Sequence, residues 1–163
     1  MASELTVQTL RGPTSGANAD TVLIPSGQTL HAPGHVIQVV NTNYTTAQTF
    51  SSASSTDSGL SLFITPKLAS SKILVNFNAH LSGNGTSQGF IQIRRGDGTL
   101  IGPDEIFYSR VSSQYTLNSF QKFDSPNTTS AVTYKIQIRA TQSTVTLNQD
   151  GGVSDVTLME IAQ

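Results

Sequence analysis

The sequence has no cysteine and no tryptophan among its 163 residues, and it has few charges. The absence of cysteine excludes disulfides, zinc–thiolate centres and thiol nucleophiles. Charged residues make up 12% of the chain, against about 25% in an average soluble domain. The net charge is −1, with Lys and Arg scattered along the chain. This distribution argues against a nucleic-acid partner, which requires a basic stripe.

The chain also lacks long apolar runs. No stretch approaches the roughly 20 apolar residues that cross a bilayer, so no membrane insertion is expected. Residues Met1–Val7 show neither the basic region nor the apolar region of a secretory signal. Yet a composition rich in Ser, Thr, Asn and Gly is typical of extracellular β proteins. A virion surface protein, made in the host cytoplasm and released by lysis, would satisfy both observations.

A period of two dominates the sequence, as in half-buried β-strands. Ile73, Val75 and Phe77 alternate with more polar neighbours, and no window of helical length carries an apolar stripe at helical spacing. Asp97-Gly98 and Asp150-Gly151 lie between strand-like runs, as in two-residue hairpins. The predicted strands are Val36–Asn41, Gln48–Phe50, Leu60–Thr65, Ile73–Phe77, Gly89–Arg94, Ile106–Tyr108, Leu117–Phe123, Thr133–Arg139, Val145–Leu147 and Val153–Ala162.

Many short strands separated by turn signals predict an all-β sandwich or barrel, and an antiparallel jelly roll suits the chain length. A boundary is expected near Pro33-Gly34, which gives an N-terminal arm of residues 1–33 and a sandwich head of residues 34–163. The arm has two strand-like pieces, Leu5–Leu10 and Thr21–Ile24, but too few apolar residues for a core of its own. We therefore expect it to anchor on a partner surface. Its candidate anchoring residues are Leu5, Val7, Leu10, Val22 and Ile24.

The last strand carries apolar side chains on both faces, which predicts that both faces are covered. One sheet of a sandwich gives cover on one side only, and a three-fold axis between subunits would supply the other. We therefore expect a homotrimer. Glu160, within this strand, is expected to face solvent or to pair with Arg or Lys. The predicted interface residues are Val156, Leu158, Met159 and Ile161.

No catalytic constellation is found, and neither enzyme activity nor a cofactor is expected. Asp104 and Glu105 are adjacent, so on a strand their side chains would point to opposite faces and could not act as an acid–base pair. Alanine at Asp104, Glu105 or Asp124 is expected to cost only modest stability. The sequence has no nucleophile elbow, phosphate loop or cluster of metal ligands.

Three short motifs have both a functional and a structural interpretation. Arg95-Gly96-Asp97 matches the integrin tripeptide, but a hairpin turn explains it better. His31 and His35 have helical metal-ligand spacing, but Ala32-Pro33-Gly34 prevents a helix; a metal on a three-fold axis and a solvated linker both remain open. His80 is expected at the rim of a strand. The sequons at Asn43, Asn84 and Asn127 are numerous enough to arise by chance in a chain this rich in Ser and Thr.

Aromatic side chains could line a sugar-binding face, although in a sandwich they more often belong to the core or to a subunit interface. The candidates are Tyr44, Phe50, Tyr108, Tyr115 and Phe120.

Several segments resemble the fibre and decoration proteins of tailed bacteriophages, especially marine ones. The head segments that carry this resemblance are Gly59–Lys67, Ser70–Val75, Asp124–Arg139 and Thr157–Ile161. In the arm, Leu5–Asn18 and Ile24–Leu30 are similar to leader segments of such proteins.

The resemblance implies a trimeric jelly roll similar to tumour-necrosis-factor-like heads, without catalytic residues. It also implies other virion proteins, of capsid or tail, as partners of the arm. The short segment before the head favours a capsid decoration protein or short head fibre. The alternative is a tail fibre, or a receptor- or glycan-binding module that contacts a host surface glycan.

Deletion of residues 1–33 is expected to leave a folded head that no longer attaches to particles, because the arm has strand-like pieces but no core. Co-sedimentation of the truncated and full-length proteins with particles measures this. Normal occupancy by the truncated protein would show that the arm is not the anchor.

Overall fold

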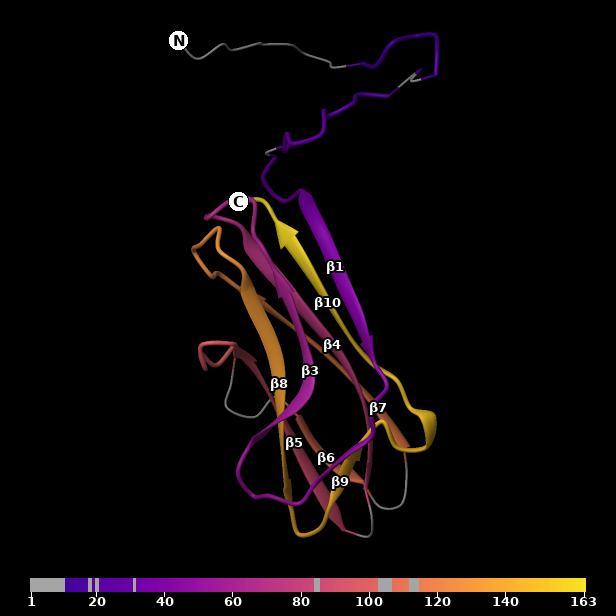
Figure 1. The fold of residues 1–163 in the computed structure, drawn as a ribbon, viewed down its shortest axis with the longest axis vertical. Coiled ribbons are helices and arrows are strands. Elements are labelled where there is room, and N and C mark those ends of the chain that lie inside the picture. Colours follow the sequence, from indigo (N-terminus) through magenta and orange to yellow (C-terminus); the bar gives the residue numbers. More distant parts are fainter. Residues whose placement is uncertain are drawn as a thin grey trace. The chain divides into compact units, whose positions relative to one another are not determined.

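The computed structural model describes residues 11–17, 19, 21–30, 32–83, 86–102, 107–111 and 115–163, with the backbone alone at 107–111. The chain divides into two units, Met1–Leu30 and His31–Gln163 (Figure 1).

The described part of the first unit forms no strand, so the predicted strand at Thr21–Ile24 is wrong. Val22 and Ile24 are exposed in the structure. No described residue within the unit forms a ladder with this segment, and an isolated extended piece has no hydrogen-bond partners of its own. Leu5, Val7 and Leu10 lie outside the described residues.

Ten strands and one 3₁₀ turn make up the described part of the second unit. They are β1 (Val36–Tyr44), β2 (Gln48–Phe50), β3 (Thr56–Ile64), β4 (Lys72–Gly83), β5 (Ser87–Arg95), β6 (Phe107–Val111), β7 (Tyr115–Asp124), β8 (Val132–Thr141), β9 (Val145–Leu147), η1 (Gln149–Gly151) and β10 (Ser154–Ile161).

The strands form two antiparallel sheets that pack face to face (Figure 1). The first sheet has the order β1-β10-β4-β7, and the second has the order β3-β8-β5-β6. Consecutive strands repeatedly change sheet in this arrangement, as in a jelly roll with two Greek keys. The predicted all-β jelly-roll sandwich is therefore confirmed.

On one side of β4 in the first sheet, two pairs of short strands follow one another. β10 pairs with the first part of β4, and β1 pairs with β10. β9 pairs with the last part of β4 on the same side, and β2 pairs with β9. Asp150-Gly151 lies in η1 between β9 and β10, so the hairpin predicted there is wrong. The prediction at Asp97-Gly98 is confirmed, because the Arg95 amide donates to the Thr99 carbonyl at 2.8 Å across that turn.

The core lies between the inner faces of the two sheets. Val156 and Leu158 of β10 are 0% exposed there, and Phe120 of β7 stacks on Phe77 of β4. Each buried side chain of this kind contributes about 1.5–3 kcal/mol. Two of the four residues predicted for a subunit interface thus lie in the chain's own core, because the second sheet already covers that face of β10.

Glu160 is also on the inner face, at the end of the sandwich, with 0% exposure. Its carboxylate accepts hydrogen bonds from Gln38 Nε2 at 2.6 Å and from the backbone amides of Lys67 and Leu68 at 2.8 and 3.1 Å. The expectation that Glu160 faces solvent or pairs with a basic side chain is wrong. It instead accepts from the amides of the β3–β4 loop and so holds that loop at the end of the sandwich.

Burial alone would raise the pKa of the Glu160 carboxyl, but the hydrogen bonds from Gln38 and from the loop amides outweigh it and hold the pKa below its usual value. A lowered folded-state pKa means that the unfolded chain binds more protons. The stability that Glu160 contributes is therefore present above the unfolded value near 4.5 and is lost as the pH falls through the folded value.

Glu160→Gln should lower the free energy of unfolding by about 1–3 kcal/mol near neutral pH. The difference from wild type should shrink in acid, where the wild-type side chain is itself protonated. Urea denaturation of both proteins at neutral and acidic pH measures this. A difference that stays constant with pH would contradict the assigned role of the carboxylate.

Candidate assembly surface and surface hollows

An in-register row of four apolar side chains crosses the outer face of the first sheet. Val39 of β1 pairs with Met159 of β10, Met159 pairs with Leu74 of β4, and Leu74 pairs with Phe123 of β7. Val39 is 53% exposed and Phe123 is 60% exposed. We call Val39, Met159, Leu74 and Phe123 the outer apolar row.

Apolar groups continue beside this row towards the end of the sheet. Val36 pairs with Ile161 there, on the same face, and the exposed Lys72 of β4 pairs with Ile161 at the margin of this area. Val36 is exposed and Ile161 is half-buried. Met159 and Ile161, the two predicted interface residues that lie outside the core, therefore belong to one apolar area on this face.

The next two rows on this face are polar but nearly uncharged. Asn41, Thr157, Asn76 and Gln121 are paired side by side across the four strands. In the row beyond, Asn78 Nδ2 donates to the two carboxylate oxygens of Asp155, Oδ1 at 2.9 Å and Oδ2 at 3.1 Å.

The outer face of the second sheet is charged instead. Lys135 Nζ lies 2.7 Å from Asp57 Oδ2, and the hydrogen bond from Lys135 lowers the pKa of Asp57. The Arg139 guanidinium carbon lies 3.7 Å from the centre of the Phe90 ring. Depletion of charge is typical of the centre of protein interfaces, so the outer face of the first sheet is the candidate assembly surface.

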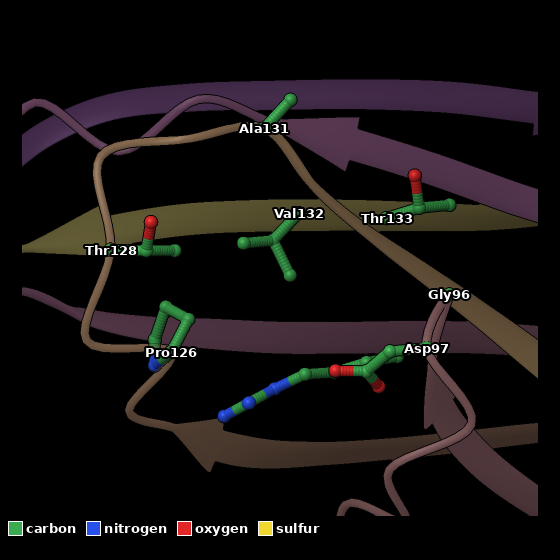
Figure 2. A pocket seen from close by; sticks show the side chains of 8 residues that line it. Gly96, Asp97, Pro126, Thr128, Ala131, Val132 and Thr133 are labelled. Atoms are coloured by element: carbon green, nitrogen blue, oxygen red, sulfur yellow. The ribbon is translucent and has the colours of Figure 1, made fainter.

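A hollow of about 370 Å³ lies at one end of the sandwich. Figure 2 shows Pro126 and Thr128 on the loop between β7 and β8, and Gly96 and Asp97 at the turn after β5. The hollow is lined by Arg95, Gly96, Asp97, Pro126, Thr128, Ala131, Val132 and Thr133.

The basic group of this hollow is already paired. Arg95 Nε and Nη2 donate to the two oxygens of Asp124 at 2.7 and 2.6 Å, and the Tyr134 hydroxyl donates to Asp124 at 2.6 Å. Asp124 raises the pKa of Arg95, while burial, followed by the hydrogen bond to Asp124, raises the pKa of Tyr134. Arg95 therefore holds the end of the sandwich together, which supports the hairpin interpretation of Arg95-Gly96-Asp97.

A second hollow, of about 380 Å³, lies beside η1. It is lined by His80, Tyr115, Gln149, Asp150, Gly151 and Gly152. The rings of His80 and Tyr115 are stacked with 5.6 Å between their centres. The Tyr115 hydroxyl donates to Asp150, and this bond raises the pKa of Tyr115.

Tyr115 is the one described member of the five candidate aromatic residues that lines a hollow. Phe50 is in the core, Tyr44 and Phe120 pack against the core, and the Tyr108 side chain lies outside the described part. His80, predicted as a rim residue, lies next to Tyr115 in the same hollow.

The remaining candidate residues form no site in the described part of the chain. His31, Asp104 and Glu105 lie outside it, and His35 is exposed. Among the residues that are described, no three His, Cys, Asp or Glu side chains come together in a way that could hold a metal. No helix in this described part has the length and apolar character to cross a bilayer.

The sequence pattern predicts an interface role for Met159 and Ile161 but gives no such prediction for Val39, Leu74 and Phe123. A signal for two of them exists, since Val39-Val40 and Ile73-Leu74-Val75 put apolar residues on both faces of a strand. The hollow beside η1 had no such signal, because it depends on β9 and β10 both pairing with β4.

No protein-family model and no curated protein matches the sequence. Among solved structures, the chain is similar to VP2 of infectious bursal disease virus in a subviral particle, with 12% identity and a TM-score of 0.44 over 93% of this chain. The present chain spans 45% of the length of that VP2 chain. A structure of the Gt strain of the same virus matches 99% of the present chain, with 13% identity and a TM-score of 0.44, and the present chain spans 47% of it. A chain of the disulfide-linked pili of Bacillus endospore appendages matches over its whole length and 85% of this chain, with 14% identity and a TM-score of 0.37. At these low TM-scores the similarities carry no functional inference.

Asp124→Ala should destabilise the protein by about 3–5 kcal/mol, because it leaves the Arg95 charge and the Tyr134 hydroxyl without their acceptor. This replaces the expectation of a modest cost. Asp57→Ala is the matched control, since it removes an ion pair of similar length from the exposed face; it should cost less than about 1 kcal/mol. Equal losses of unfolding free energy for the two variants in urea denaturation would contradict the greater importance of the Arg95–Asp124 pair.

Proposed function

We propose that this protein is a non-enzymatic structural component of the exterior of a bacteriophage particle, assembled from identical copies. The observation that carries the proposal is the outer apolar row, which has no cover within the described part of the chain. The sequence resemblance to fibre and decoration proteins of tailed phages supplies the biological setting.

The physical case for assembly rests on the exposed apolar area. Each apolar side chain that is removed from water contributes about 1.5–3 kcal/mol, and four neighbours in one row present a continuous patch. Contiguous patches of this kind mark interaction sites. The chain also carries little charge to keep copies apart.

The proposed occupant of the face is a second copy of this chain in a closed homotrimer. A cyclic arrangement lets every copy use the same area and leaves no copy with an open apolar row. Met159 and Ile161 contribute to this interface, and residues 1–33 join the head to another virion protein. No cofactor is needed for this role.

Within this role, a capsid decoration protein or short head fibre is the preferred form. A receptor- or glycan-binding module is the second candidate, and the hollow beside η1 favours it. The two functions use different parts of the head.

The test compares two phenylalanines with nearly equal exposure on opposite faces. Phe123 is 60% exposed in the outer apolar row, and Phe63 is 62% exposed on the second sheet. Phe123→Asp should convert the wild-type assembly, of about three times the 17.3 kDa chain mass, into monomers, since it would bury an unpaired charge. Phe63→Asp should leave the assembly intact. Light scattering gives the masses, and thermal melts show whether each variant is folded.

Two results would overturn the proposal. One is a wild-type monomer at micromolar concentration. The other is the same mass change in both variants, because the apolar face would then have no special role. Met159→Asp and Ile161→Asp are expected to act like Phe123→Asp.

A further inference from the structure

The hollow beside η1 is built on the outer face of the first sheet, where the chain leaves the sheet between β9 and β10. Asn148 precedes this excursion in a left-handed conformation with φ of 55°. Its Nδ2 donates to the Tyr44 carbonyl at 2.7 Å, and its Oδ1 accepts from Ser154 Oγ at 2.6 Å. Asn148 therefore joins β1 to both ends of the excursion and fixes its position.

Hydrogen bonds from the sheet hold the excursion in place. Ser82 Oγ on β4 donates to Gln149 Oε1 at 2.5 Å, and the Tyr115 hydroxyl on β7 donates to Asp150. Gly152 lies against the His80 ring, and a Cβ at this position would come within 2.1 Å of His80 Nδ1. The hollow is thus a fixed surface feature built by β4, β7 and η1.

Tyr115 is held in this hollow although 54% of it is exposed. The His80 ring, tilted by 22° from the Tyr115 ring, stacks on one of its faces. A ligand would therefore contact the opposite face of the Tyr115 ring. Leu117, next on the same outer face of β7, is also exposed.

We propose that this hollow binds a single uncharged sugar ring. The C–H groups on one face of a pyranose carry partial positive charge and pack on the negative face of an aromatic ring, here Tyr115. Asp150 and Gln149 offer oxygen acceptors for sugar hydroxyls at the edge of that ring. An apolar surface with a few convergent polar groups is the usual composition of a small-ligand site.

The charges of the lining select the class of sugar. Among the six described residues that line it, Asp150 is the charged one, and none of these six is a Lys or Arg that would balance it. A sialic acid or a sulfated sugar would place a second negative charge near this carboxylate, which is unfavourable. The site therefore favours neutral hexoses and N-acetylhexosamines.

The sugar site and the outer apolar row lie apart on the same sheet. Leu74 and His80 are six residues apart on β4, which corresponds to about 20 Å along a strand. Contact through the row leaves the hollow accessible. Sugar binding is therefore a second function beside the proposed assembly and does not depend on it.

The test is an amide chemical-shift titration of the full-length protein with methyl glycosides of glucose, galactose, mannose and N-acetylglucosamine, and with the methyl glycoside of N-acetylneuraminic acid, which is a single charged ring. At least one neutral glycoside should shift the amides of Gly151, Gly152 and Tyr115, and the N-acetylneuraminic acid glycoside should not. Tyr115→Ala should weaken this binding by about tenfold, the value expected from loss of one aromatic stacking contact. Tyr115→Phe, which keeps the ring, should retain most of it.

Phe63→Ala is the matched control, because Phe63 is an aromatic residue of similar exposure on the second sheet, away from the lining residues; its affinity should equal that of wild type. The inference is overturned if no neutral glycoside shifts these amides, if the N-acetylneuraminic acid glycoside binds more tightly, or if Tyr115→Ala binds as wild type does. The mass of Tyr115→Ala should equal that of wild type, so that a failure here is separate from a failure of assembly.

Discussion

The packing of two sheets through one face each is the constraint on which the rest of this structure depends. A β-strand places alternate side chains on opposite faces, and a sandwich covers only the inner one. Val156 and Leu158 of β10 lie on this inner face and are completely buried. Met159, between Leu158 and Glu160 in the chain, must then point outward, where the first sheet has no second layer in the described structure. The outer apolar row thus follows from the same alternation that forms the core.

Buried polar groups mark the places where this packing ends. Glu160 accepts from loop amides at one end of β10, and Asn148 joins the interrupted strands at the other. Asp124 is paired with Arg95 and Tyr134 where β7 gives way to a loop. A buried polar group is tolerated when its hydrogen bonds are satisfied, and each of these groups binds backbone or side chains of other strands or of a loop. These hydrogen bonds fix the ends of the strands, whose positions apolar packing alone does not determine.

The sequence predicted most strands and the jelly roll because the period of two is a local property. Gln48–Phe50 and Val145–Leu147 have the predicted bounds. Local patterns do not show which face of β10 the second sheet covers, and so the sequence predicts an interface role for Val156 and Leu158, which the structure places in the core. Asp150-Gly151 resembles a hairpin turn because its residues suit any tight turn. It lies between β9 and β10, which both pair with β4 and not with each other. That arrangement depends on the whole fold and cannot be predicted from the local sequence.

Low charge links the two proposed functions of the first sheet. A face with few charges can be buried against a copy without the desolvation cost that ions impose, and the row of four apolar side chains gives that contact its position. The rows beyond it, such as the one with Asn76 beside Thr157, are polar, so apolar contact has reason to end there. Past them, Tyr115 is the next large exposed ring on β7, and it is stacked on His80 beside the turn of η1. One sheet thus presents an apolar area suited to a second copy at one end and an aromatic surface suited to a small neutral ligand at the other.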